Sequence, residues 1–407
     1  MPGPELTLER VAELTDGAIV RGRPEMALDD VCTDSRRALA PDSLFVALVG
    51  ERFDGHDFLE QAFEKGARAA LVSRVDNRAP AEMALVRVDD TLAALQRLAA
   101  GWRATFDIPV VGITGSNGKT IVKDMLASIL AQEHTVYRSP GSYNSQIGVP
   151  LSLLGLRDEH QIAIIEAGIS RVGEMERLEE MIRPTHGVIT NIGMAHAAGL
   201  HDLETTAREK LKLFGRFEEE PLVFPASSEP LRQQALPGDP LSFGVEAVGN
   251  LRPSQAIDNA ADFSVVDAVD SDGGFELTVR FPDGERHDFV LHAPGRHNLS
   301  NAVAAIAAAD RLGASIEAMR EGLAAYELSP LRLEMHTTQR GVTLINDAYS
   351  SDPVSARAAL SVLQDYAGEQ RAIAILGDML DLGARSEAEH RRLGQMVARS
   401  DVDHLVC

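Results

Sequence analysis

One glycine-rich segment constrains the fold of this chain more than any other feature. An apolar run over residues 109–114 predicts a β-strand, and a helical pattern over 119–131 follows it after a short turn. A strand that turns through glycines into a helix points backbone N–H groups and the positive end of the helix dipole at one place, which suits a phosphate group. Lys119 would reach the β- and γ-phosphates of a nucleotide there, and the Thr120 hydroxyl would bind Mg²⁺.

The turn has its own glycine spacing. In the commonest phosphate-binding motif the first glycine would fall where this chain has Ile113, whereas the glycines here are Gly112, Gly115 and Gly118. A lysine and a threonine directly after the last glycine still favour a nucleotide site over an ordinary strand–helix turn. We therefore predict that ATP is bound by Gly115, Ser116, Asn117, Gly118, Lys119 and Thr120.

Strand and helix patterns alternate after this loop, which is typical of an α/β fold with a mostly parallel sheet. The predicted strands are 162–166, 187–191 and 222–224, and the predicted helices are 119–131, 174–181 and 203–214. Residues 263–292 change to short β-rich runs, broken at 272–273 and 283–284 by Asp-Gly pairs that favour hairpin turns. We expect an antiparallel piece appended to the parallel sheet, followed by helices over 298–312 and 315–326.

Three domains are expected from the length of 407 residues and from these changes of pattern. They are an N-terminal α/β domain over 1–104, a central domain with the phosphate loop over 105–328, and a C-terminal Rossmann-like domain over 329–407. The last domain shows only about three strands, which is few for its class. The sequence therefore predicts an incomplete C-terminal domain and a natural chain that continues beyond Cys407.

Charge and composition disfavour several classes of protein. The formal net charge is −22, and non-specific nucleic-acid binding needs clustered lysine and arginine instead. No run of about 18 apolar residues predicts a transmembrane helix, and the acidic start of the chain does not resemble a signal peptide. The two cysteines, Cys32 and Cys407, cannot build a disulfide framework. We therefore expect a cytoplasmic protein.

The segment Thr-Gly-Ser-Asn-Gly-Lys-Thr over 114–120 resembles the phosphate loop of the Mur ligase family, and the resemblance extends along the whole chain. Near the start, the stretches 33–37, 43–48 and 50–56 are similar to the uridine-nucleotide-binding domain of these ligases. The resemblance implies that a UDP-linked substrate is bound by Ser35, Arg36, Phe45 and Asn144.

Further stretches indicate a position within the family. Residues 376–383, with Ser386 and His390, resemble the members that add D-alanyl-D-alanine to UDP-N-acetylmuramoyl-tripeptide. Residues 142–150 and 166–170 resemble the subgroup in which that ligase is fused to an alanine racemase. The resemblance thus implies an ATP- and Mg²⁺-dependent ligase of peptidoglycan synthesis, with those two substrates and with a fused or partner racemase.

Two predicted metal ligands follow strands of the central sheet. Glu166 ends the run 162–166, and ligands of open α/β sheets bind at the carboxyl ends of strands. A carboxylate there suits Mg²⁺, although a helix cap or a salt bridge would explain the same residue. His196 follows the run 187–191, where a lone histidine is more often a packed or surface residue. The resemblance implies that both residues bind the metal and that His196 takes part in catalysis.

The helix predicted over 203–214 carries a lysine on an apolar stripe. Its spacing puts on one face Leu203, Ala207, Lys210 and Phe214, and on the polar side Thr205, Arg208, Glu209 and Lys212. A lysine on such a stripe often extends its amine to water. The resemblance implies instead that Lys210 is carbamylated, and that its new carboxylate binds Mg²⁺ and serves catalysis. Burial would favour the neutral amine that carbamylation requires.

The remaining nucleotide contacts are implied by resemblance. ATP would also be contacted by His297, Asn298, Asn301, Arg332 and Asp347. An ordinary helix cap would explain Asn298 or Asn301 equally well, because both lie at the start of an alanine-rich helix. After Asp347 the family is richer in asparagine, whereas this chain has Ser350 and Asp352.

The implied reaction begins when the terminal carboxylate of the tripeptide attacks the γ-phosphate of ATP. The amine of the dipeptide then attacks the acyl phosphate. Two alternatives stay open: a relative that adds a single amino acid or glutamate, and a non-catalytic protein that binds the UDP-precursor. Intact Lys119, Thr120, Glu166 and His196 favour an enzyme.

Overall fold

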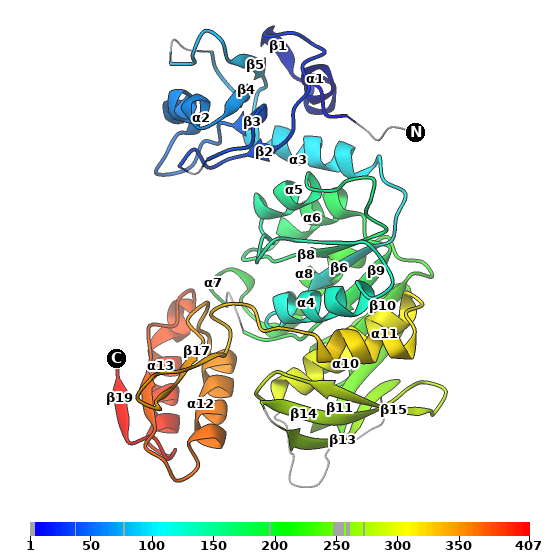
Figure 1. Cartoon of the computed structure of the whole chain (residues 1–407), viewed down its shortest axis with the longest axis vertical. Coiled ribbons are helices and arrows are strands. Elements are labelled where there is room, and N and C mark those ends of the chain that lie inside the picture. The colour runs from blue at the N-terminus through cyan, green and yellow to red at the C-terminus, as the bar shows by residue number, and fades with distance from the viewer. Residues whose placement is uncertain are drawn as a thin grey trace. The chain divides into compact units, whose positions relative to one another are not determined.

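The computed structural model describes residues 5–36, 38–75, 78–194, 197–246, 256–257, 261–271 and 273–407. The chain divides into two compact units, and Figure 1 labels most of their helices and strands. The first unit contains residues 1–110, 137–167 and 177–183, and the second contains 111–136, 168–176 and 184–407. Each unit has a buried apolar core. The predicted domain boundaries near 104 and 328 stay predictions.

A five-stranded sheet organises the start of the first unit. Its strands, in spatial order, are β1 (Ala18–Arg21), β5 (Ala84–Arg87), β4 (Ala67–Val72), β3 (Ser43–Val46) and β2 (Val31–Cys32). The strands from β5 to β2 run parallel, and β1 pairs with β5 in the antiparallel sense.

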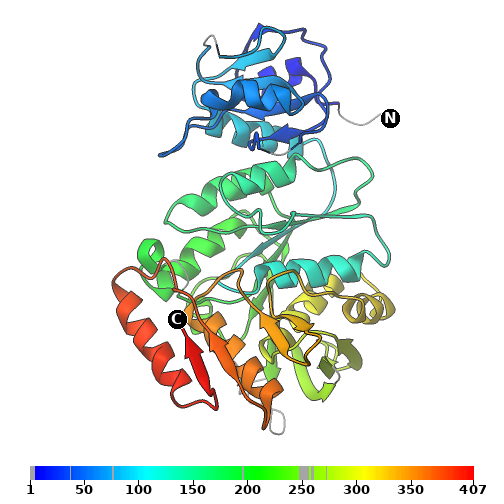
Figure 2. The ribbon, with the colours of Figure 1, turned by 60° about the vertical axis from the view of Figure 1, so that its left-hand side comes forward.

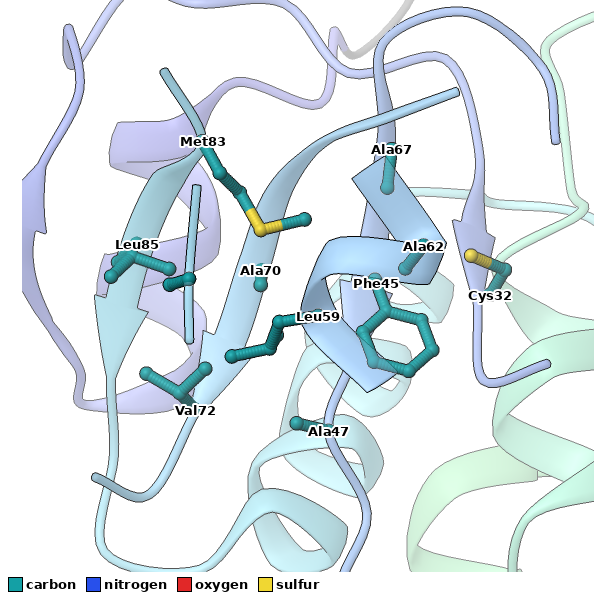
Figure 3. Close-up of a cluster of buried hydrophobic side chains, with 11 residues drawn as sticks. Cys32, Phe45, Ala47, Leu59, Ala62, Ala67, Ala70, Val72, Met83 and Leu85 are labelled. Carbon is teal, nitrogen blue, oxygen red and sulfur yellow. The ribbon is translucent and has the colours of Figure 1, made fainter. Parts of the chain in front are cut away.

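Helices cover this sheet and continue the first unit. They are α1 (Leu8–Thr15), η1 (Gly55–Phe58), α2 (Leu59–Glu64), α3 (Thr91–Arg103) and α5 (Gly148–Leu153). Strand β8 (Ile162–Glu166) also lies in this unit, while β7 (Val136–Arg138) and α6 (Glu174–Ile182) each have residues in both units. Apolar residues of α2 pack on the sheet, as Figure 3 shows for Leu59 and Ala62 beside Phe45. Asp90 begins α3, because its carboxylate accepts from Leu92 N and Ala93 N.

The sheet of the second unit is parallel along most of its width. The neighbouring parallel strands are β6 (Val110–Thr114), β9 (His186–Ile189), β10 (Pro221–Pro225), β11 (Asp239–Glu246) and β13 (Phe263–Ser271), with β12 (Ala256–Ile257) beside β11. Strands β14 (Gly274–Arg280) and β15 (Arg286–Leu291) continue it in the antiparallel sense. The predicted appended antiparallel piece is thus confirmed.

Of the two predicted Asp-Gly turns, the second is confirmed. Gly284 has φ +89°, and its N–H donates to the carbonyl of Phe281 at 3.0 Å, which closes the turn between β14 and β15. In the first turn, Asp272 lies outside the described residues, while Gly273 has φ +76°.

The helices of the second unit before residue 329 are α4 (Lys119–Leu130), α7 (Ala197–Leu200), α8 (Leu203–Leu211), η2 (Lys212–Phe214), α9 (Glu229–Arg232), α10 (His297–Arg311) and α11 (Ile316–Ala324). Figure 1 shows α10 and α11 side by side, and both pack against α4. Small residues allow this close approach. A Cβ on Gly322 of α11 would lie 2.3 Å from the Cα of Ile129 in α4, so only glycine fits there.

The end of the chain forms two small strand pairs and two helices. Strands β16 (Glu334–Thr337) and β17 (Thr343–Asn346) make an antiparallel pair, and β18 (Ile373–Ile375) runs parallel to β19 (His404–Val406). Helices α12 (Pro353–Ala367) and α13 (Ser386–Val397) lie side by side in Figures 1 and 2, and η3 (Gly383–Arg385) leads into α13. In the part of the chain that the structure describes, no helix is long and apolar enough to cross a membrane.

Candidate functional site

The phosphate loop is held from the side by the segment after β9. The last residues of β6 and β9 are paired, so the segments that follow both strands leave the sheet at the same edge. Asn191 binds the loop twice: its carbonyl accepts from Ser116 N at 3.0 Å, and its Oδ1 accepts from Asn117 N at 2.7 Å. These two loop amides therefore donate to Asn191, and the motif alone does not predict this contact. Asn191 directly follows a strand, and this position is the only feature of the sequence that points to its contact with the phosphate loop.

Two glycines let this loop approach its neighbours closely. Gly115 has φ +147°, and a Cβ there would lie 1.9 Å from Thr190 Oγ1. Gly118 has φ +79°, and a Cβ there would lie 2.5 Å from Asn301 Oδ1. The second approach brings the predicted nucleotide residue Asn301 to the end of the phosphate loop.

Two lysines meet at the same point of the loop. Lys119 Nζ donates to the carbonyl oxygens of Gly115 at 3.0 Å and Ser116 at 3.1 Å, so its side chain lies over its own loop. Lys210 Nζ donates to the same Gly115 oxygen at 2.9 Å. The structure thus brings together the phosphate-loop lysine and the predicted carbamylated lysine.

Lys210 is buried, as the apolar stripe predicts. It lies near the end of α8, a helix that Asp202 caps through the Thr205 N–H, and it is 3% exposed. Burial, followed by the charge of Lys119, lowers the pKa of Lys210 well below the ordinary 10.5. The neutral amine that attacks CO₂ is therefore favoured at this position. The carbamate itself stays a prediction.

Glu209 does not lie on the polar side of α8, where the spacing placed it. It is 2% exposed, and its Oε2 accepts from Gly173 N at 2.8 Å while its Oε1 pairs with Lys212 Nζ at 2.8 Å. Lys212 also pairs with Glu176 Oε1 at 3.1 Å. The prediction failed because Gly173, from another segment of the chain, covers Glu209, and the spacing of residues within one helix does not report such a contact.

The asparagines at the start of α10 form a buried chain of hydrogen bonds. Asn298 Nδ2 donates to Pro294 O at 2.7 Å, and Asn301 Nδ2 donates to Asn298 Oδ1 at 2.9 Å. No side chain caps α10, so the helix-cap explanation of these residues is wrong. Burial lowers the pKa of His297, the first residue of α10, to about 4, and its imidazole is therefore neutral near pH 7.

Arg332 reaches the phosphate loop from the C-terminal region. Its Nη2 donates to Thr120 Oγ1 at 3.2 Å, and its guanidinium lies 4.2 Å from the centre of the Tyr349 ring. Asp347 lies next to it and accepts from Leu333 N at 3.1 Å. Burial raises the pKa of Asp347 to about 6, against the opposing effects of the Leu333 hydrogen bond and the Arg332 charge.

Asp352 also touches the loop. It caps α12 by accepting from Val354 N at 2.8 Å, and its other carboxylate oxygen accepts a short hydrogen bond from Asn117 Nδ2. The departure from the asparagine-rich family segment therefore places a carboxylate against the phosphate loop. Sequence reasoning did not find this contact, because the two residues are far apart along the chain.

In the first unit, two predicted site residues lie together. Asn144 Nδ2 donates to Glu166 Oε1 at 2.6 Å, and the buried Glu166 also donates its N–H to Ser139 Oγ at 3.1 Å. His196, the second predicted metal ligand that follows a strand of the central sheet, lies outside the described residues. Among the residues that the structure describes, no group of three or more His, Cys, Asp or Glu side chains could hold a metal ion.

The three predicted substrate residues at the start of the chain differ in exposure. Ser35 is buried and donates from Oγ to Gln61 Oε1 at 2.8 Å, whereas Arg36 is exposed and pairs with Asp34 at 2.8 Å. Phe45 is 2% exposed and packs in the core (Figure 3). Phe45 could therefore contact a substrate only through its backbone, and the substrate-binding role of Phe45 stays a prediction.

Sequence models of three protein domains match this chain. They are the Mur ligase family catalytic domain over residues 30–103, the Mur ligase middle domain over 113–309, and the Mur ligase glutamate ligase domain over 331–407. Two similar proteins are the UDP-N-acetylmuramoyl-tripeptide–D-alanyl-D-alanine ligases of Bacillus subtilis and Escherichia coli. The first is 34% identical over 98% of this chain and 84% of its own length. The second is 35% identical over 98% of this chain and 85% of its own length.

Two solved structures resemble the fold closely. MurF from Acinetobacter baumannii superposes with a TM-score of 0.85 at 29% identity, over 100% of this chain and 86% of that chain. MurF ligase from Thermotoga maritima, in complex with ADP, superposes with a TM-score of 0.77 at 26% identity. The match covers 91% of this chain and 82% of that chain.

Proposed function

This chain belongs to the Mur ligase family, and we propose that it joins D-alanyl-D-alanine to UDP-N-acetylmuramoyl-tripeptide in an ATP-dependent step of peptidoglycan synthesis. One observation carries the ATP chemistry: Lys119, Lys210 and Arg332 all bind atoms of the phosphate-loop region. The activity for which the two relatives are named, over a match of 98% of this chain, supports the choice of substrates.

The proposed site would promote the reaction by stabilising the negative charge that develops on the transferring phosphate. As the tripeptide carboxylate attacks the γ-phosphate, the bond between the γ-phosphorus and the bridging oxygen breaks and ADP leaves. Negative charge develops on the phosphate oxygens, and Lys119, which lies over the phosphate loop, would stabilise it. Arg332, at the Thr120 hydroxyl, adds a second cation from the C-terminal region. The acyl phosphate then loses phosphate when the dipeptide amine attacks its carbonyl, and a peptide bond forms. Water must be kept from this intermediate, because hydrolysis would waste it.

The magnesium ligands that we propose are Thr120, Glu166, His196 and carbamylated Lys210. The donor chemistry fits, because Glu166 is a buried carboxylate and Lys210 has the depressed pKa that carbamylation needs. Bound Mg²⁺ would neutralise charge on the transferring phosphates. The asparagine chain of α10 supports the proposal that His297, Asn298 and Asn301 hold the nucleotide, with Asp347 beside Arg332.

The remaining assignments are also proposals. We infer three domains at 1–104, 105–328 and 329–407, supported by three domain matches in the same order. The first domain would bind the UDP end through Ser35, Arg36 and Phe45, and Asn144 would add a contact. We infer a cytoplasmic location, where the nucleotide substrates are made, and an alanine racemase as a fused or separate partner.

Phosphate release tests the proposal. The enzyme is incubated with ATP and Mg²⁺, and with UDP-N-acetylmuramoyl-tripeptide whose third residue is either lysine or diaminopimelate. D-alanyl-D-alanine should then release phosphate with one of the two tripeptides. Parallel reactions pair D-glutamate, lysine or diaminopimelate with the shorter precursor that each would extend. Turnover only in one of these would assign the chain to another ligase of the family, and binding of the precursor without any turnover would favour the non-catalytic alternative.

A further inference from the structure

The linker between α11 and β16 has a strained backbone around Arg332. Leu331 has φ +62° and Leu333 has φ +52°, so two leucines adopt the left-handed region on either side of the arginine. That region is unfavourable for a residue with a Cβ, and it persists only where surrounding contacts hold it. The conformation that presents Arg332 is therefore imposed on the linker by its contacts.

Three hydrogen bonds hold this linker in addition to those of Arg332 and to the bond from Leu331 N to Glu334 Oε2 at 3.1 Å. Tyr349 N donates to Leu331 O at 3.2 Å, and Leu333 N donates to Asp347 Oδ1 at 3.1 Å, which ties the linker to the segment after β17. Before the strained residues, Ser329 Oγ donates to Asp124 Oδ2 at 2.7 Å. This third bond ties the linker to α4, the helix that begins at the phosphate loop.

Asp124 and Thr120 present a matched pair of attachment points. They are four residues apart on α4, so they lie on the same face about 6 Å apart along the helix axis. Thr120 receives Arg332, and Asp124 receives Ser329, three residues earlier in the linker. The two bonds therefore attach the linker to one face of the helix at two successive turns.

The buried Lys123 lies beside the Asp124 carboxylate and stabilises its charge. Lys123 is 1% exposed, and its Nζ lies 3.6 Å from Asp124 Oδ1, while the Asp124 side chain is only 12% exposed. A carboxylate with so little solvent needs a nearby cation and a hydrogen-bond donor, and Lys123 and Ser329 supply them. The geometry of Asp124 is thus fixed on both of its oxygens.

We propose that Asp124 is a positioning residue: by holding Ser329, it keeps the strained linker on α4 and so keeps Arg332 at the Thr120 hydroxyl. The proposal rests on the proposed function only in that Arg332 is taken to act on the ATP phosphates. Without the Ser329 bond, the two leucines can relax out of the left-handed region, and Arg332 leaves the phosphate loop.

A double-mutant cycle tests this role. Asp124→Ala and Ser329→Ala are each made alone and together with Arg332→Ala, and kcat, KM for ATP and the ATP dissociation constant are measured. Alone, each should lower kcat/KM for ATP about tenfold and weaken ATP binding, whereas in the Arg332→Ala background each should change both quantities by less than about twofold. Asp124→Asn keeps an acceptor for Ser329 and should retain most of the activity. Gln132→Ala, exposed just beyond α4, is the matched control and should behave as the parent in both backgrounds.

Equal losses from Asp124→Ala or Ser329→Ala in both backgrounds would overturn the proposal, because Asp124 would then act without Arg332. No loss from either variant would overturn it as well. Ser329→Ala leaves the residues of α4 intact, so it decides the matter if Asp124→Ala does not fold. If the parent enzyme releases no phosphate with any acceptor, the proposed function fails, and the same cycle on the ATP dissociation constant still tests the positioning.

Discussion

Lys119 and Lys210 donate to one acceptor, the carbonyl oxygen of Gly115, from the phosphate-loop helix and from α8. Two ammonium groups that share an acceptor repel each other, and burial strengthens the repulsion because little water screens it. The pKa of Lys210 is lowered in this environment, first by burial and then by the charge of Lys119. A carbamate on Lys210 would replace the repulsion with attraction, so the contact favours the carbamate over a free ammonium.

The carbamate can be tested by removing its amine. Lys210→Ala should lose activity by about 100-fold or more, because a metal ligand is lost. Acetate or formate added in solution should restore part of the activity by replacing the missing carboxylate. Depleting CO₂ from the parent enzyme should lower its activity, and bicarbonate should restore it. Phosphate release is the measurement in each case.

The control for this test follows from the structure. Lys212 was expected on the polar side of the helix, but it pairs with the buried Glu209, so its removal would disturb α8 and it is not a suitable control. Arg208 is exposed on the same helix and bonds only locally to Thr205 in the described contacts, and Arg208→Ala should be nearly silent. Equal losses from Lys210→Ala and Arg208→Ala, without rescue by carboxylic acids, would make Lys210 a structural residue.

Lys119→Ala should abolish turnover while the chain still folds. The variant removes the cation nearest the transferring phosphate, and the expected loss in kcat is about 10³-fold. Circular dichroism and thermal melting should match the parent, since Lys119 donates to carbonyl oxygens of its own loop. Lys65→Ala, an exposed lysine in the first unit, controls for the loss of a positive charge. Near-normal turnover of Lys119→Ala would refute the assignment of the phosphate loop.

The local periodicity of apolar residues in the sequence predicted most of this fold. The strand before the phosphate loop, the helix after it, the appended antiparallel piece and the burial of Lys210 all depend on neighbours in the sequence. Periodicity reports such features directly, because the alternation of apolar residues reflects which face of an element is buried.

Contacts between distant segments were beyond that reasoning. Glu209 is buried because Gly173 N lies against it, and Asp352 touches the loop because α12 begins beside Asn117. Each partner comes from another element, and no spacing rule connects them. The left-handed backbone at Leu331 and Leu333 was equally unreadable, since leucine carries no preference for that region.

The raised pKa of Asp347 predicts a pH-dependent stability. Its pKa is about 6 in the folded chain against 3.8 for an ordinary aspartate, so the folded state holds the proton more tightly. The contribution of this carboxyl to stability is therefore full below pH 3.8 and is lost as pH rises through about 6. Asp347→Asn cannot ionise, and its melting temperature relative to the parent should be higher at pH 7 than at pH 4. Asp401→Asn, at an exposed position, should show no such change; an equal shift in both variants would mean that net charge, not Asp347, sets the trend.

The close approach of Gly118 to Asn301 predicts a variant that separates backbone strain from nucleotide binding. Gly118 and Gly313 have the same φ of +79°, but a Cβ on Gly118 would meet Asn301 Oδ1 at 2.5 Å, whereas one on Gly313 would meet nothing within 4 Å. Alanine at either position should cost about 1–2 kcal/mol of unfolding free energy, because both glycines adopt the left-handed region. Only Gly118→Ala should also displace Asn301 and the end of the loop, and it should raise the ATP dissociation constant at least about tenfold, or ~1.4 kcal/mol. Calorimetric titration with ATP and denaturant unfolding of both variants provide the two measurements. Equal ATP affinity in Gly118→Ala and Gly313→Ala would mean that the contact between the loop and α10 does not shape the nucleotide site.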